Sequence, residues 1–130
     1  MREAKQVIVM RRCGMRRGKE IAQGGHSVIA FLKKRMSWVS RLKAVFFGND
    51  FPEATRQWME TGEAKICVKV DSENELLEVY NNAKGAGLEV HLITDSGKTE
   101  FAGVPTKTCL AIGPNWSDDI DKITGHLKLY

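Results

Sequence analysis

The first third of the chain passes from a short apolar run to a longer helical pattern. Residues 6–10 (QVIVM) are almost continuously apolar, which predicts a strand buried on both faces, and residues 11–14 follow as a loop. From about Gly18, apolar residues recur at helical spacing. We therefore predict a helix with one apolar stripe, formed by Ile21, Val28, Ile29, Leu32 and Met36. Residues 38–51 allow a second helix ending in a Gly-Asn-Asp turn.

The rest of the chain alternates short helices with strands. Pro52 suits the first turn of a short helix that runs to Gly62. Ser72 and Glu75 form a capping box that opens a further helix, and a last helix is predicted to be capped by Ser117. Strands are predicted over residues 64–70, 88–94 and 106–112, with residues 127–130 as a tail. This order predicts an α/β domain with a mostly parallel or mixed sheet and helices on both faces.

Length and composition bound this prediction. The 130 residues are enough for one domain, spanning 1–130, and 42% hydrophobic residues can build its core. No apolar run approaches the roughly 20 residues of a membrane helix, and the N-terminus lacks a secretory leader. The three cysteines are far apart and lack CxxC spacing, so neither disulfides nor a zinc site is indicated. We expect a reduced, intracellular protein without a metal or cofactor.

The charge is divided unevenly along the chain. Residues 1–43 carry twelve Lys or Arg against two Glu, whereas the remaining 87 residues carry eight basic and fourteen acidic side chains. The two parts thus have net charges of +10 and −6. A one-sided positive field of this kind favours polyanionic partners, although a solvated basic face without a ligand explains the charge alone equally well.

The loop before the first helix resembles a phosphate-binding loop only in part. Three residues, not four, separate Gly14 from Gly18, and Glu20 stands where magnesium binding needs Ser or Thr. What remains is a basic loop leading into a helix N-terminus, which favours an anion. Lys19 in the first helical turn opposes the helix dipole, and a nearby phosphate or oxyanion would explain it.

Further along this helix, His26 allows two interpretations. It could act as a general base, but a packed, hydrogen-bonded helix residue is the commoner case. Gly24 and Gly25 are costly inside a helix, which indicates either close approach of a backbone or ligand, or a helix irregularity.

A second group of polar residues follows the predicted strand 88–94. Asp95 and Thr99 belong to the sequence DSGKT, and carboxylates just past a strand end lie where α/β proteins bind ligands. Asp95 could position a water molecule, with a raised pKa if it is partly desolvated. A plain turn explains the same residues, because Asp and Gly favour turns for local reasons.

Five ordered blocks of the sequence give a more specific indication. They are KQVIVMR, MRRGKEIAQGGHS, TGEAKICVK, GLEVHLITDSGKTEF and, after LAIGP, the ending DKITGHLKLY. Together they resemble the archaeal and eukaryotic-type (class II) peptidyl-tRNA hydrolases over nearly the whole chain. The family usually reads Met-Gly-Lys-Gly-Lys where this chain has Arg16 and Arg17 before Gly18 and Lys19.

The resemblance implies a fold, an activity and a set of residues. It implies a mixed four-stranded sheet between helices, usually in a homodimer, in the cytoplasm. It implies hydrolysis of the ester between a peptide and the 3′ ribose of tRNA, without a metal. The family's functional lysine, aspartate and threonine correspond to Lys19, Asp95 and Thr99, and its Gln and His positions to Gln23 and His26. The basic charge of residues 1–43, and not the resemblance, adds Arg16 and Arg17 as expected substrate contacts. A non-catalytic tRNA- or protein-binding module on the same fold is the alternative.

Overall fold

Four strands form one mixed sheet in the computed structural model, which describes residues 2–36, 42 and 51–130. The strand order is β2-β1-β4-β3, with β1 parallel to β2 and β4 antiparallel to both of its neighbours. The strands are β1 (Ala4–Arg11), β2 (Lys65–Val70), β3 (Val90–Asp95) and β4 (Thr106–Trp116). The central β1 and β4 are longer than the runs 6–10 and 106–112 that hydrophobicity indicated.

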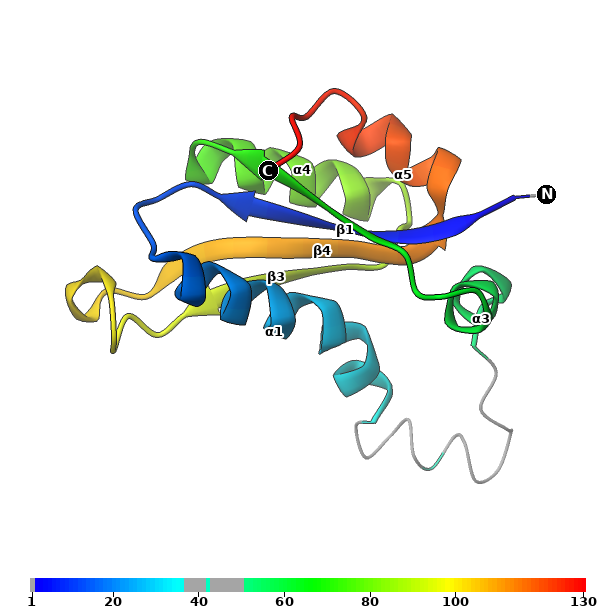
Figure 1. Ribbon diagram of the computed structural model, residues 1–130, viewed down its shortest axis with the longest axis horizontal. Coiled ribbons are helices and arrows are strands. Elements are labelled where there is room, and N and C mark those ends of the chain that lie inside the picture. The colour runs from blue at the N-terminus through cyan, green and yellow to red at the C-terminus, as the bar shows by residue number, and fades with distance from the viewer. Residues whose placement is uncertain (1, 37–41, 43–50) are drawn as a thin grey trace.

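Helices cover both faces of this sheet (Figure 1). Of the helices in the described residues, two lie on one face, α1 (Arg17–Arg35) and α3 (Glu53–Glu60), and two on the other, α4 (Glu73–Gly85) and α5 (Ser117–Thr124). A single 3₁₀ turn, η1 (Phe101–Gly103), precedes β4. The prediction of a three-layer α/β fold with a mixed sheet is confirmed.

Each face of the sheet has its own hydrophobic core. Beneath α4 and α5, the β1 residues Val7 and Val9 pack with Leu76, Leu110 and Ile120, all almost fully buried. On the opposite face, Ala4 joins Phe31 and Trp58, whose rings meet edge to face with their centroids 5.8 Å apart. The strand β1 is therefore buried on both sides, as its continuous apolar run predicted.

The predicted apolar stripe of α1 faces the core only in part: Val28 and Leu32 are half-buried, and Leu32 packs against the cluster of Phe31 and Trp58. Ile21 is 71% exposed and Met36 is 61% exposed, whereas Gln23, Gly24, Ser27 and Phe31 are buried. The polar members of this face can be buried because each has a hydrogen-bond partner. Ser27 Oγ donates to the Gly24 carbonyl at 2.7 Å, and Gln23 is held as described below.

Of the two helix caps predicted from the sequence, one is present in the structure and the other is not. Ser72 caps α4 as predicted, because its hydroxyl accepts a hydrogen bond from the Glu75 amide at 3.1 Å. The prediction of Ser117 as the cap of α5 is wrong: Trp116 is the capping residue, and the Ser117 amide donates to the Glu3 carbonyl. The possible second helix over residues 38–51 lies almost entirely outside the described residues.

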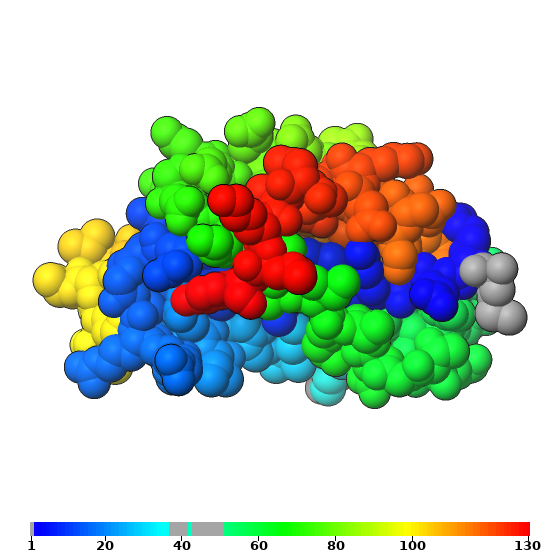
Figure 2. Space-filling model, turned by 45° about the horizontal axis from the view of Figure 1, so that its top comes forward, coloured from blue at the N-terminus to red at the C-terminus, as the bar shows by residue number. Residues whose placement is uncertain are grey.

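The C-terminal tail closes one edge of the sheet. The Tyr130 amide donates to the Cys67 carbonyl at 3.0 Å, and Leu129 forms an antiparallel bridge with Val68 of β2. The Tyr130 hydroxyl donates to the Glu20 carboxylate of α1, with an O–O distance of 2.6 Å. Figure 2 shows this red segment lying against the blue and green parts of the surface. Within the described residues, β3 is left as the open edge of the sheet.

Candidate active site

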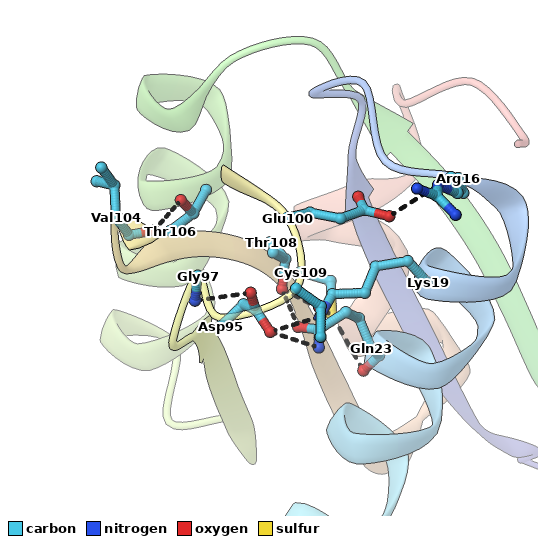
Figure 3. A network of polar contacts seen from close by, with 11 residues as sticks. Arg16, Lys19, Gln23, Asp95, Gly97, Glu100, Val104, Thr106, Thr108 and Cys109 are labelled. Carbon is cyan, nitrogen blue, oxygen red and sulfur yellow. Dashed lines mark hydrogen bonds and ion pairs between the residues drawn. The ribbon is translucent and has the colours of Figure 1, made fainter. Parts of the chain in front are cut away.

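Three side chains that are far apart in the sequence meet at one end of the sheet. The Lys19 Nζ atom donates to Asp95 Oδ1 and to Thr99 Oγ1, both at 2.8 Å. Lys19 lies in the first turn of α1, Asp95 is the last residue of β3, and Thr99 belongs to the loop that follows (Figure 3 labels Lys19 and Asp95). The anion that explains a lysine at this helix start is thus a carboxylate of the protein itself. The convergence expected from the resemblance is present.

Asp95 is held from three directions. Its Oδ1 atom accepts from Lys19 and, at 3.4 Å, from Gln23 Nε2, while Oδ2 accepts from the Gly97 amide at 2.9 Å. The Lys19 hydrogen bond, followed by that of Gly97, holds the pKa of Asp95 below its ordinary value. The expectation of a raised pKa is therefore wrong, because these donors outweigh the desolvation of a side chain that is only 10% exposed.

The turn after β3 has room only for a glycine at position 97. Gly97 has a φ of +81°, and a Cβ there would lie 2.4 Å from the Val104 carbonyl oxygen. Both facts exclude ordinary side chains. The close approach folds residues 96–104 back on themselves and aims the Gly97 amide at Asp95 (Figure 3). In the sequence, the glycine indicated only a turn.

A buried threonine that the sequence analysis did not single out orients Gln23. Thr108 Oγ1 donates to Gln23 Oε1 at 2.5 Å, and the Cys109 thiol donates to the Gln23 carbonyl at 3.3 Å (Figure 3). Since the amide oxygen accepts from Thr108, the amide nitrogen is turned toward Asp95. Thr108 is fully buried in β4, but in the sequence it directly follows the polar residues Thr106 and Lys107, so no local pattern marked it.

The remaining predicted residues surround this centre less closely. His26 is exposed, so its interpretation as a packed helix residue is wrong; it lines a groove together with Gln23 and Asp95. The Arg16 side chain is 87% exposed and lies 3.7 Å from the Glu100 carboxylate. Arg17 lies at a different groove on the other side of α1, beside Glu20 and Tyr130.

Among the described residues, two grooves therefore lie along α1. The first, of 310 Å³, lies between α1 and β3 and begins at Gln23 and Asp95. The second, of 520 Å³, lies between α1 and the β1–β2 side of the sheet and is lined mainly by apolar atoms. Only the first reaches the cluster around Asp95 among the residues described.

Two classes of feature are missing from the described part of the chain. Residues 2–36, 42 and 51–130 contain no group of three His, Cys, Asp or Glu side chains placed to hold a metal ion. Within the same residues, no helix has the length and apolar character needed to cross a membrane.

Comparison with known proteins identifies the family. Residues 4–130 match the family model described as "Peptidyl-tRNA hydrolase PTH2". This chain belongs to that family. A peptidyl-tRNA hydrolase of Methanocaldococcus jannaschii is 44% identical over 128 residues, which cover 96% of this chain and 98% of the relative. One of Halobacterium salinarum is 41% identical over 128 residues, covering 97% and 99%.

A longer relative contains this domain, and a more distant solved structure shares its fold. The mitochondrial peptidyl-tRNA hydrolase 2 of Bos taurus is 38% identical over 129 residues, which are 98% of this chain and 65% of the bovine protein. A solved structure of a protein of unknown function from Agrobacterium tumefaciens superposes with a TM-score of 0.60, covering 100% of this chain and 99% of the other. At 10% identity, this likeness supports only the fold of this PTH2 family member and says nothing of its activity.

Proposed function

We propose that this PTH2 family member hydrolyses the ester bond between a peptide and the 3′ ribose of tRNA. The observation that carries the proposal is the convergence of Lys19, Asp95 and Thr99 in a chain whose family model spans residues 4–130. The curated relatives described above carry the name of this activity.

In this mechanism, Asp95 orients the attacking water. A carboxylate offers about four lone-pair positions, and Lys19, Gln23 and Gly97 occupy three of them. The remaining position is on Oδ2, where a water molecule donates one proton and turns its oxygen toward the ester carbonyl. Because its pKa is lowered, Asp95 is ionised at neutral pH and acts mainly by orientation, taking the proton as the water attacks.

Lys19 stabilises the charge that develops on the substrate. A lysine ammonium has three N–H groups, and Asp95 and Thr99 accept from two of them. The third is directed to the carbonyl oxygen, which becomes an oxyanion when water adds to the carbonyl carbon. The carbon–oxygen bond to the ribose then breaks, and the ribose oxygen leaves with the proton that Asp95 took from the water, which restores the carboxylate. These steps use side chains only, so EDTA should leave turnover unchanged.

The basic first third of the chain is proposed to bind the tRNA backbone. Its net charge of +10 includes the exposed Arg16, and phosphate contacts position a nucleic acid without reading its sequence. The proposal extends to a cytoplasmic homodimer, in which a second copy covers exposed apolar side chains such as Leu129, 72% exposed. Light scattering coupled to gel filtration measures the mass of the protein in solution and so tests whether it is a dimer.

Cleavage of N-acetyl-aminoacyl-tRNA by purified protein tests the activity. Loss of one oxyanion donor costs about 10²–10³ in kcat, so Lys19→Met should reduce kcat by at least that factor. Lys98→Met, which removes an exposed lysine from the same loop as Thr99, is the matched control and should retain turnover. A protein that binds tRNA but shows no turnover would instead be the non-catalytic binding module.

A further inference from the structure

We propose that the α1/β3 groove, the 310 Å³ groove lined by Gln23, His26, Ile29 and residues 92–96, binds the peptide part of the substrate as an extended strand added to β3. This inference rests on the proposed function and names how the peptide is held.

The lining residues of β3 place this groove along the edge of the sheet. Successive side chains of a strand point to opposite faces, so a cavity on one face is lined by every second residue. Here the last four residues of β3, 92–95, all line the same groove, and Ser96 of the following loop continues it. A cavity with this lining lies beside the strand backbone. In the described part of the chain, β3 pairs only with β4, which leaves its outer N–H and C=O groups available for another strand.

The groove starts at the reactive centre and has the length of a short peptide. Gln23 and Asp95 line one end and Lys33, ten residues further along α1, lines the other. Ten residues of α-helix span about 15 Å, and an extended chain advances about 3.3 Å per residue. The groove therefore holds about four peptide residues. Because the ester at the peptide's C-terminus lies at Asp95, the C-terminal residue of β3, the added strand runs parallel to β3.

Strand addition also suits the chemistry of the substrate. Peptides released from tRNA differ in sequence, and main-chain hydrogen bonds to a strand edge bind all of them alike. Every second peptide side chain would face α1, where Ile29 is 47% exposed, and the others would face away from the helix. The groove thus supplies affinity for the peptide with weak preference for its sequence.

Binding of non-hydrolysable analogues tests this independently of catalysis. The probes are tRNA molecules with a 3′ amide link to N-acetyl-alanine, to N-acetyl-tetra-alanine, and to the same tetrapeptide N-methylated at its second residue from the link. We expect the tetrapeptide to lower Kd by about tenfold relative to the single alanine, and N-methylation to remove most of that gain. Amides of β3 should also exchange more slowly with solvent only when the unmethylated tetrapeptide is bound.

A pair of α1 variants locates the site. Ile29→Asp should weaken tetrapeptide binding several-fold, whereas Ile21→Asp, at a more exposed isoleucine beside the other groove, should leave it unchanged. Equal Kd values for the three probes, or equal effects of the two variants, would overturn the proposal. Since these are binding measurements, they stand apart from ester cleavage, whose absence would contradict the proposed function instead.

Discussion

The hydrogen bond from Thr108 to Gln23 gives a sharp test of how the active site is organised. Thr108→Val keeps the shape of the side chain but removes the hydroxyl that donates to Gln23 Oε1 at 2.5 Å. Both residues are buried, so the amide oxygen loses its partner where water cannot easily replace it. An unsatisfied buried acceptor costs about 1–3 kcal/mol, and we expect the free energy of unfolding to fall by that amount.

The same change should affect catalysis through Gln23. Without Thr108, the amide can turn over, so that its oxygen instead of its nitrogen faces the Asp95 carboxylate. We expect kcat on N-acetyl-aminoacyl-tRNA to fall by about tenfold or more, with a smaller change in KM, because the tRNA contacts are untouched. Denaturant unfolding and steady-state cleavage measure the two effects on one preparation.

Two further variants separate positioning from stability. Thr108→Ser retains the hydroxyl and should restore kcat, even though the lost methyl group lowers stability. Thr106→Val removes an exposed hydroxyl two residues away on the same strand, which donates to the Val104 carbonyl, and should leave kcat unchanged. If Thr108→Val is fully active, or if Thr108→Ser is as impaired as the valine variant, Thr108 does not position Gln23.

Two other predictions concern the surface. Replacing Arg16 and Arg17 together by Ala should weaken tRNA binding and reduce the slope of log Kd against log salt by up to about two phosphate contacts, as measured by filter binding. The control is the double variant Lys84→Ala with Lys122→Ala, which removes the same charge from α4 and α5. It should change neither the affinity for tRNA nor the salt slope. Gly25→Ala should raise the free energy of unfolding by about 0.5–1 kcal/mol, because Gly25 is an exposed mid-helix position where an added Cβ meets no atom within 4 Å. A destabilised Gly25→Ala protein would show that this position needs glycine.

The sequence predicted the order of helices and strands better than it predicted which side of each helix is buried. Helix α1 followed from periodicity, but its apolar stripe identified the buried side only in part, because Gln23, Gly24 and Ser27 occupy much of that side. Gln23 can be buried because its side-chain oxygen accepts a hydrogen bond from Thr108, which is 85 positions away in the sequence. Hydrophobicity carries no information about such a pair.

The candidate site was predictable only in part for a similar reason. Lys19 and Asp95 are separated by 76 residues, and only the family resemblance brought them together before the structure did. Local reasoning also gave the wrong sign for the pKa of Asp95, since it considered burial without the lysine that faces it. Functional sites are where local rules fail, because residues there are placed for chemistry as well as for folding.

The role of Asp95 can be tested by removing its charge while keeping its shape. Asp95→Asn retains the size of the side chain and one of its two acceptor oxygens, but it cannot take a proton and no longer attracts the Lys19 ammonium. We expect kcat to fall by about 10²–10⁴, with a smaller change in KM. Single-turnover cleavage of peptidyl-tRNA and the melting temperature, measured on the same preparation, distinguish this from a folding defect.

The pH dependence separates the catalytic effect from a general electrostatic one. Because the pKa of Asp95 is lower in the folded protein than in the unfolded chain, its ion pair stabilises the fold above the unfolded pKa, and this contribution is lost as the pH falls through the folded pKa. Asp118 lies on α5, away from the active site, and its pKa is also lowered, mainly by the hydrogen bond from Arg2. Its ion pair therefore stabilises the fold with the same dependence on pH. Both Asn variants should therefore flatten the acid side of the stability curve, but only Asp95→Asn should lose turnover at neutral pH. A folded Asp95→Asn protein with near-normal cleavage would remove Asp95 from the mechanism and leave Lys19 and Thr99 as binding residues.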